Sequence, residues 1–228
     1  MKKISFIGVF DKIDLILSVA KVLERTNKKV LVVDATTNQK SRYVVPAINP
    51  TVSYVTEFEN IDVAVGFKNF EEIRRYLGVE DNTTIDYDFV LIDTDTYDGI
   101  LEFEVQNSDL IYYVTSFDAY SLKKGIELLN ELDIPLHMTK VFFSKNMLKE
   151  EEEYFEYLSL GVKVLWNDDK IYFLLENGDN AALIENQRLA KIKFKNLSNE
   201  FKDNVAYMVN NIDDQIDEKS AKLIIKNL

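Results

Sequence analysis

The chain contains no cysteine among its 228 residues. This absence excludes a disulfide framework, and it excludes a thiolate as nucleophile or zinc ligand. A reducing cytoplasm is the compartment that this composition fits best. The chain also has a single histidine, His137, which follows Pro135 and has no serine or cysteine nucleophile pattern near it. We therefore interpret His137 as structural and expect no catalytic triad.

Basic residues are in the minority, with 27 Lys and Arg against 39 Asp and Glu and a net charge of -12. The electrostatic field of this net negative charge repels nucleic-acid phosphates, so no nucleic-acid partner is expected.

Long apolar runs are missing as well. The run after "MKK" is too short for a signal sequence, and no other run approaches the length needed to span a bilayer.

What is present is an alternation of short apolar runs with segments of helical period, the pattern of repeated βαβ units. It predicts an α/β fold of three layers with a mainly parallel central sheet. Residues 4–8, 30–34 and 89–92 are continuously apolar, as expected of strands covered on both faces, and the first of them should lie inside the sheet. A helix should begin at Lys12 or just after it. We expect a polar loop over 93–99 and a last strand over 162–168. We expect one domain over 1–228, helical from about residue 180, with Leu189 in an apolar stripe that packs on the sheet.

Four segments resemble, in order and spacing, the ParA/MinD-like branch of the P-loop ATPases. "NKKVLVVD" resembles the second strand of that family, and "YDFVLIDTDT" its Walker-B-type strand. "SDLIYYVTSFDAYSLKKGIELLNEL" resembles the next strand and helix, and "VLWNDDKIYFLLENGDNAAL" the stretch that usually carries a base-binding loop. The resemblance covers nearly the whole chain and implies a three-layer fold like that of the P-loop NTPases.

The phosphate loop of that family reads KGGxGKT[ST], and this chain departs from it. Aligned by the helix that follows, Ile7 stands at the signature lysine and Lys12 at the second lysine. Val9 and Asp11 replace two glycines, although a phosphate cradle needs glycines so that backbone N–H groups can turn inward. Ile13 and Asp14 replace the hydroxyl residues, one of which holds magnesium in the family.

The resemblance thus implies a degenerate nucleotide site. Its residues are Gly8, Asp11, Lys12, Asp14, Asp34 and Asp93. Asp11 and Asp14 would oppose a polyphosphate at the helix N-terminus. Asp34 and Asp93 are either former metal or water ligands or caps of the next turn, with about equal weight. Lys12 either keeps a phosphate contact or is solvated between Asp11 and Asp14, and we favour the second.

Further departures lie at Thr36, Ser144 and Trp166, where the family often has an aspartate, a base-reading asparagine and a proline. Trp166 is more readily explained as a core or interface residue than as a stacking partner of a base. Two basic segments remain. We expect the cluster 187–196 to be a solvated helix face, and the amphipathic tail 219–228 to pack on the domain rather than anchor a membrane.

Within the ParA/MinD-like group, the chain is most similar to the TadZ/CpaE-like proteins of Tad-type pilus and secretion systems. This similarity implies a cytoplasmic positioning or assembly factor that is non-catalytic or binds nucleotide only weakly. It implies no required cofactor, and contact with the membrane periphery only through partners. It also implies a homodimer across the loop face, with Val9, Phe10 and Ile13 in the interface. The alternatives are an active ATPase using ATP and magnesium, and a dinucleotide enzyme, which the absence of G-x-G-x-x-G disfavours.

Overall fold

The computed structural model describes residues 1–48, 51–79, 84–144, 149–174 and 177–228. Its strands form one eight-stranded sheet in the order β3-β4-β2-β5-β1-β6-β7-β8, parallel except for the antiparallel pair of β3 and β4. The strands are β1 (Lys2–Ile7), β2 (Val30–Ala35), β3 (Tyr54–Phe58), β4 (Ile61–Val65), β5 (Phe89–Thr94), β6 (Leu110–Ser116), β7 (Leu136–Ser144) and β8 (Val164–Leu174).

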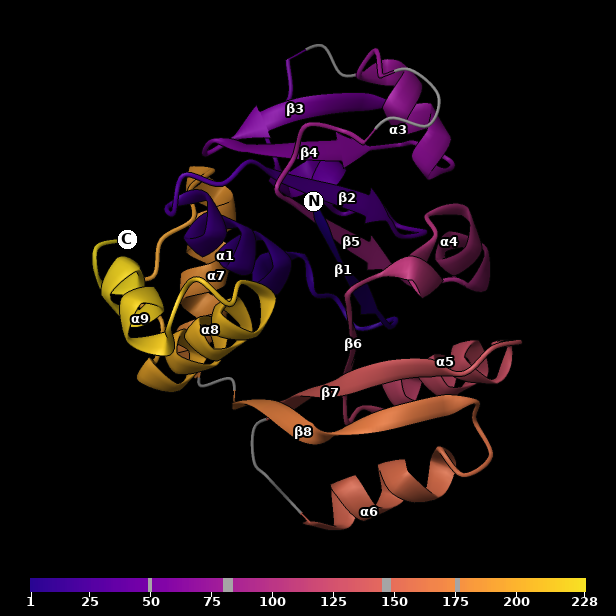
Figure 1. The fold of residues 1–228 in the computed structure, drawn as a ribbon. Coiled ribbons are helices and arrows are strands. Elements are labelled where there is room, and N and C mark those ends of the chain that lie inside the picture. The colour runs from indigo at the N-terminus through magenta and orange to yellow at the C-terminus, as the bar shows by residue number, and fades with distance from the viewer. Residues whose placement is uncertain (49–50, 80–83, 145–148, 175–176) are drawn as a thin grey trace.

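Helices cover both faces of this sheet, so the fold has three layers (Figure 1). One face packs against α1 (Ile13–Glu24), α2 (Ser41–Val44), α7 (Asn177–Leu189), α8 (Asn199–Ile212) and α9 (Glu218–Lys226). The other packs against α3 (Phe70–Tyr76), α4 (Tyr97–Glu102), the short 3₁₀ helix η1 (Val105–Asn107), α5 (Ala119–Asn130) and α6 (Lys149–Leu158). The predicted α/β class with a mainly parallel sheet is confirmed.

Strands buried on both faces explain the continuous apolar runs. β1 lies between β5 and β6 in the sheet interior, as predicted, and every residue of β5 is buried.

Side-chain caps start several helices: Asn69 accepts from Glu72 N–H, Asp118 from Tyr120 and Ser121 N–H, and Ser198 from Phe201 N–H. Such caps satisfy backbone donors that have no partner within the helix.

Three boundaries differ from the sequence predictions. β8 continues through the polar residues 167–170 to Leu174, where only a short strand ending at Asp168 was expected. The loop expected over 93–99 contains the start of α4, which Thr96 caps, since the Thr96 side chain accepts from Gly99 N–H. The C-terminal part, expected to be helical from about residue 180, is interrupted first at Ala190, where φ is +48°, and contains α7, α8 and α9.

The end of α7 before Ala190 also alters the predicted positions of Leu189 and of the basic cluster 187–196. Leu189, expected in the packed stripe, is exposed at the end of α7. The basic cluster 187–196 leaves the helix after Leu189, so it is not the helix face that we expected. The tail behaves as predicted: α9 packs on α8 and buries Ala221 and Ile225 in the core. Within the described residues, no helix is long and apolar enough to cross a membrane.

Candidate functional site

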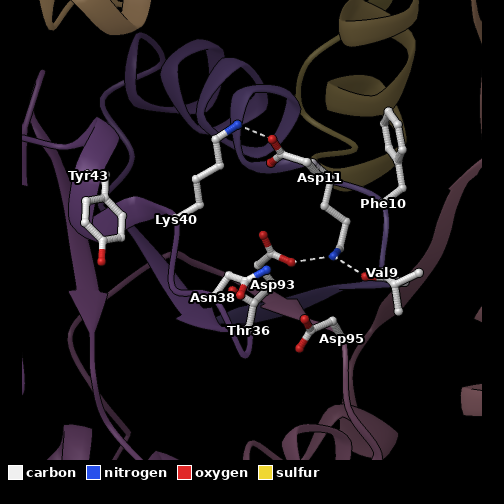
Figure 2. Close-up of a pocket in the computed structure, with 11 residues that line it drawn as sticks. Val9, Phe10, Asp11, Thr36, Asn38, Lys40, Tyr43, Asp93 and Asp95 are labelled. Atoms are coloured by element: carbon white, nitrogen blue, oxygen red, sulfur yellow. Dashed lines mark hydrogen bonds and ion pairs between the residues drawn. The ribbon is translucent and has the colours of Figure 1, made fainter. Parts of the chain in front are cut away.

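A cavity of about 410 Å³ opens at the carboxyl ends of β1, β2 and β5, where open parallel sheets place their ligand sites (Figure 2). Its wall combines the turn after β1 with the segment after β2 and the end of β5. The lining residues are Gly8, Val9, Phe10, Asp11, Lys12, Thr36, Asn38, Lys40, Tyr43, Asp93 and Asp95. Four of the six predicted site residues therefore meet in one place.

Packing against β6 requires a glycine at position 8. Its φ of +140° is open to glycine and strained for other residues. A Cβ at this position would lie 2.1 Å from the carbonyl oxygen of Val114 in β6. The loop thus needs glycine to pass the neighbouring strand, whether or not anything binds in the cavity.

Lys12 is the centre of the site. Its Nζ lies 2.6 Å from Asp93 Oδ1 and donates a hydrogen bond of 2.6 Å to the carbonyl oxygen of Gly8. Figure 2 draws both interactions as dashed lines. Only 3% of Lys12 is exposed. The expectation of a solvated lysine between Asp11 and Asp14 is wrong, because Lys12 turns inward to the end of β5.

Asp93 is held at this point by the register of the sheet, in which it pairs with Phe6 of β1 and Asp34 of β2. Burial raises the pKa of Asp93 to about 7; the Lys12 ammonium acts against this rise, and the Asp34 carboxylate adds to it. The ammonium of Lys12 is therefore the main compensation for a carboxyl group buried in the sheet.

A second ion pair closes the mouth of the cavity. Lys40, just before α2, is paired with Asp11 across the opening, as Figure 2 shows. Asp95 accepts hydrogen bonds from the N–H and hydroxyl of Thr37. The cavity is thus lined by three carboxylates and two ammonium groups, and both ammonium groups already have a carboxylate partner.

Asp34 does not line the cavity and acts as a cap. Its Oδ1 accepts from the N–H and hydroxyl of Thr36, and its Oδ2 accepts from the N–H of Ser41, the first residue of α2. Of the two roles that the sequence left open for Asp34, the structure shows the cap. Thr36, where the family often has an aspartate, serves this same turn.

Asp14 and Ile13 also lie outside the cavity. Asp14 faces α7, where Gln187 Nε2 donates to its Oδ2 at 2.8 Å, and burial raises its pKa to about 6. Ile13 is 1% exposed and belongs to the core. An interface role for Ile13 is therefore excluded, because the first turn of α1 directs this side chain toward the sheet.

The two remaining loop residues are half-buried. Val9 and Phe10 line the cavity, and the Phe10 ring lies 4.9 Å from that of Phe143 in β7. Trp166 packs edge-on against Tyr113 and Phe155, in agreement with the core role expected for it.

Four lining residues were not predicted from the sequence: Asn38, Lys40, Tyr43 and Asp95. Each lies shortly after a strand that ends at the same edge as β1. The signal was available, since polar residues after Asp34 and Asp93 must meet at that edge. The pairing of Lys40 with Asp11 depends on the path of the chain between β2 and α2, which no local pattern gives.

The cavity residues do not fit a nucleoside triphosphate with magnesium. Ile13 lies in the core at the position where a hydroxyl would hold the metal, and Asp14 points to α7. Within the described residues, no group of three or more His, Cys, Asp or Glu side chains could hold a metal ion. The buried cation of the loop is neutralised by Asp93.

Comparison with solved structures defines the relatives of this fold. A plasmid partition protein from Borrelia burgdorferi B31 bound to AMPPNP has a TM-score of 0.58 at 17% identity, covering 92% of this chain and 99% of that chain. A ParA family ATPase from Chlorobium tepidum TLS has a TM-score of 0.55 at 15% identity, covering 98% and 96%. A chain of the MinC:MinD cell division protein complex of Aquifex aeolicus has a TM-score of 0.57 at 11% identity, covering 99% and 96%.

These structures define the class: the chain has the fold of the ParA/MinD P-loop ATPases. No family model matches the chain, and no curated protein matches it either.

Proposed function

We propose that this protein is a ParA/MinD-like scaffold that does not hydrolyse ATP and serves as a positioning or assembly factor. The observation that carries the proposal is the buried pair of Lys12 and Asp93, 2.6 Å apart. Asp93 and the Gly8 carbonyl oxygen engage two of the three donors of the Lys12 ammonium, so a phosphate would compete with a carboxylate that has no other cation within contact distance among the described residues.

The other groups at the cavity support this proposal. Asp11 holds Lys40 at the mouth, so the second cation is also engaged. The carboxylates of Asp93, Asp11 and Asp95 would oppose the charge of a polyphosphate at short range. Positioning and electrostatic stabilisation supply most of the catalysis of phosphoryl transfer, and among the described residues neither a group of three or more side chains that could hold a metal ion nor a free cation is in place at this cavity.

Such a scaffold acts through protein partners, and it is formed by a single domain over residues 1–228. The MinC:MinD complex is a precedent for direct binding between a protein of this class and another protein. We group the chain with TadZ/CpaE-like factors of Tad-type pilus or secretion machines on the basis of the degenerate loop. The corrected loop face for a homodimer comprises Val9 and Phe10, with Ile13 excluded by its burial.

Calorimetry on the purified protein tests the proposal. We expect no heat of binding above dilution for ATP with magnesium, and no steady-state hydrolysis. Lys12→Ala and Lys40→Ala are the matched variants, because both remove a cavity lysine and only the first removes the buried one. A wild-type turnover abolished by Lys12→Ala would overturn the proposal in favour of an active ATPase.

A further inference from the structure

A second cavity lies between α8, α9 and the segment that joins α7 to α8. Its volume is about 620 Å³. We call it the basic groove, defined by Phe194, Lys195, Lys202, Lys222, Ile225 and Lys226. The apolar floor consists of Leu228, which is partly exposed, and of Phe194 and Ile225 beneath it, which are almost wholly buried; the lysines and Asp203 surround it.

The basic groove carries an excess of positive charge, although the chain as a whole is negatively charged. Lys222 is paired with Asp203 and Glu218. Within the part of the chain that the structure describes, Lys195, Lys202 and Lys226 have no carboxylate partner. Residues 187–228 carry eight basic and six acidic side chains, in a protein whose net charge is -12. Unpaired ammonium groups around an apolar floor are suited to an acidic ligand with an apolar part.

The chain itself presents such a surface on α6 and the turn that follows it. The outward side chains there, which we call the α6 face, are Glu150, Glu153, Tyr154, Tyr157 and Leu160. Tyr157 is 69% and Leu160 74% exposed. Residues three and four apart share one side of a helix, so the carboxylates and the tyrosine rings lie together. Glu153 is paired with Lys149 one turn away, and both of these side chains are exposed.

The two surfaces lie on opposite faces of the sheet. Phe155 anchors α6 in one core, and Phe201 and Ile225 anchor α8 and α9 in the other. Figure 1 shows α6 below β8 and α9 on a different side of the molecule. A contact between them must therefore join different molecules, and it must join unlike surfaces.

We propose that the α6 face of a second copy of this chain docks in the basic groove. The side chains of Tyr157 and Leu160 cover the apolar floor, and the carboxylates of Glu150 and Glu153 pair with the free lysines. Aromatic anchors with a charged rim are typical of protein interfaces. Because the contact is head-to-tail, it generates a ring or an open chain of copies rather than a closed dimer. It uses surfaces separate from the cavity at the strand ends, so it does not rest on the function proposed above.

Cysteine cross-linking tests this contact, since the native chain contributes no thiol. Chains carrying Tyr157→Cys are mixed with chains carrying Asn227→Cys, which lies at the groove, and oxidised with copper phenanthroline in air. Phe10→Glu is present in both to remove the other proposed interface. We expect a disulfide-linked dimer containing one chain of each kind, with a yield several-fold lower in about 0.5 M salt, where charges are screened beyond ~4 Å.

The matched control replaces Tyr157→Cys with Tyr120→Cys, an equally exposed tyrosine on α5. A yield no higher than this control would overturn the proposal. A charge exchange gives a second measurement: Lys202→Glu with Lys226→Glu in the groove should abolish the cross-link, and Glu150→Lys with Glu153→Lys on the other chain should restore it. A groove that binds dodecyl phosphate but gives no cross-link would assign it to a small anionic ligand and contradict docking of a second copy.

Discussion

The neighbours of Lys12 determine which anion its ammonium group contacts. A lysine at this position of a glycine-rich loop can meet phosphate, but here its ammonium contacts the carboxylate of Asp93 at 2.6 Å. The Asp93 side chain therefore lies where an external anion would otherwise contact the Lys12 ammonium. The loop can therefore stay folded without a bound ligand, because the buried charges of Lys12 and Asp93 compensate each other.

Asp14 provides a residue-scale prediction about pH. Burial raises its pKa from 3.8 to about 6, so the folded state binds this proton more tightly than the unfolded state does. The free energy of unfolding must therefore fall as the pH rises from about 4 to 6, and the loss persists above that range. Asp14→Asn should raise the stability at pH 7.5 by about 1–2 kcal/mol, after a small loss of helix-dipole energy.

Urea unfolding at pH 5 and pH 7.5 measures this effect. The stabilisation should be smaller at pH 5, because the wild-type carboxyl group is then largely protonated. Asp168→Asn, at an exposed position of β8, should change stability by less than about 0.5 kcal/mol at both pH values. A variant of Asp14 that is less stable than wild type at pH 7.5 would show that the charge is compensated by its surroundings.

At the residue scale, the sequence predicted positions better than contacts. It placed Gly8, Asp11, Lys12 and Asp93 in one site, because strand ends meet at one edge of a parallel sheet. It did not give the direction of each side chain. Ile13 and Asp14 follow Lys12 directly and yet point to the core and to α7, since successive helix residues differ in direction by about a quarter turn.

At the scale of elements, α5 is fixed to the sheet by the close approach of Gly125 to Tyr113. A Cβ on Gly125 would lie 2.2 Å from the hydroxyl oxygen of Tyr113, a side chain buried in β6. Tyr113 is fully buried, and its ring packs against those of Phe155 and Trp166, so a shift of the tyrosine would disturb both contacts.

We therefore predict that Gly125→Ala destabilises the protein by about 1–3 kcal/mol, even though alanine is the better helix former. Gly178→Ala in α7 is the matched control, since a Cβ at that position would have no neighbouring atom within 4 Å. That variant should be neutral or slightly stabilising. Thermal unfolding of both variants makes the comparison, and equal effects would refute the packing role of Gly125.

Element types were largely predictable, and the errors have physical causes. β8 extends past the polar residues 167–169 because its pairing with β7, interrupted by an irregularity between Met138 and Lys140, resumes at Lys170, and a hydropathy pattern does not contain this tertiary pairing. The break at Ala190 is not marked by glycine or proline. A positive φ at alanine is imposed by the packing of Ile192 and Phe194 into the core, a tertiary effect that local propensity does not contain.

For the whole molecule, the loop face predicts a homodimer that includes Val9 and Phe10. Phe10 is half-buried on Phe143, so only part of its ring is available to a partner. An interface needs upward of about 1,000 Å², and these two residues would form its apolar centre. Sedimentation velocity on chains carrying Lys202→Glu and Lys226→Glu, which disable the basic groove, should show a dimer at micromolar concentration that Phe10→Glu dissociates.

Tyr76→Glu is the control for this experiment, because Tyr76 is exposed at the end of α3 on the other face of the sheet. It should leave the dimer intact. A wild-type monomer at high micromolar concentration, or a dimer indifferent to Phe10→Glu, would refute the loop face as an interface.

The edge strand β8 limits how this molecule can associate with other chains. Its outer edge has no strand beside it among the described residues, and such an edge can template the addition of foreign strands. Asn167, Asp168 and Asp169 stand exposed in the middle of it. An incoming backbone would have to desolvate these side chains, so the strand resists amyloid-like stacking during synthesis and at high local concentration. Copies of the chain can then associate through side-chain surfaces without adding a strand at β8.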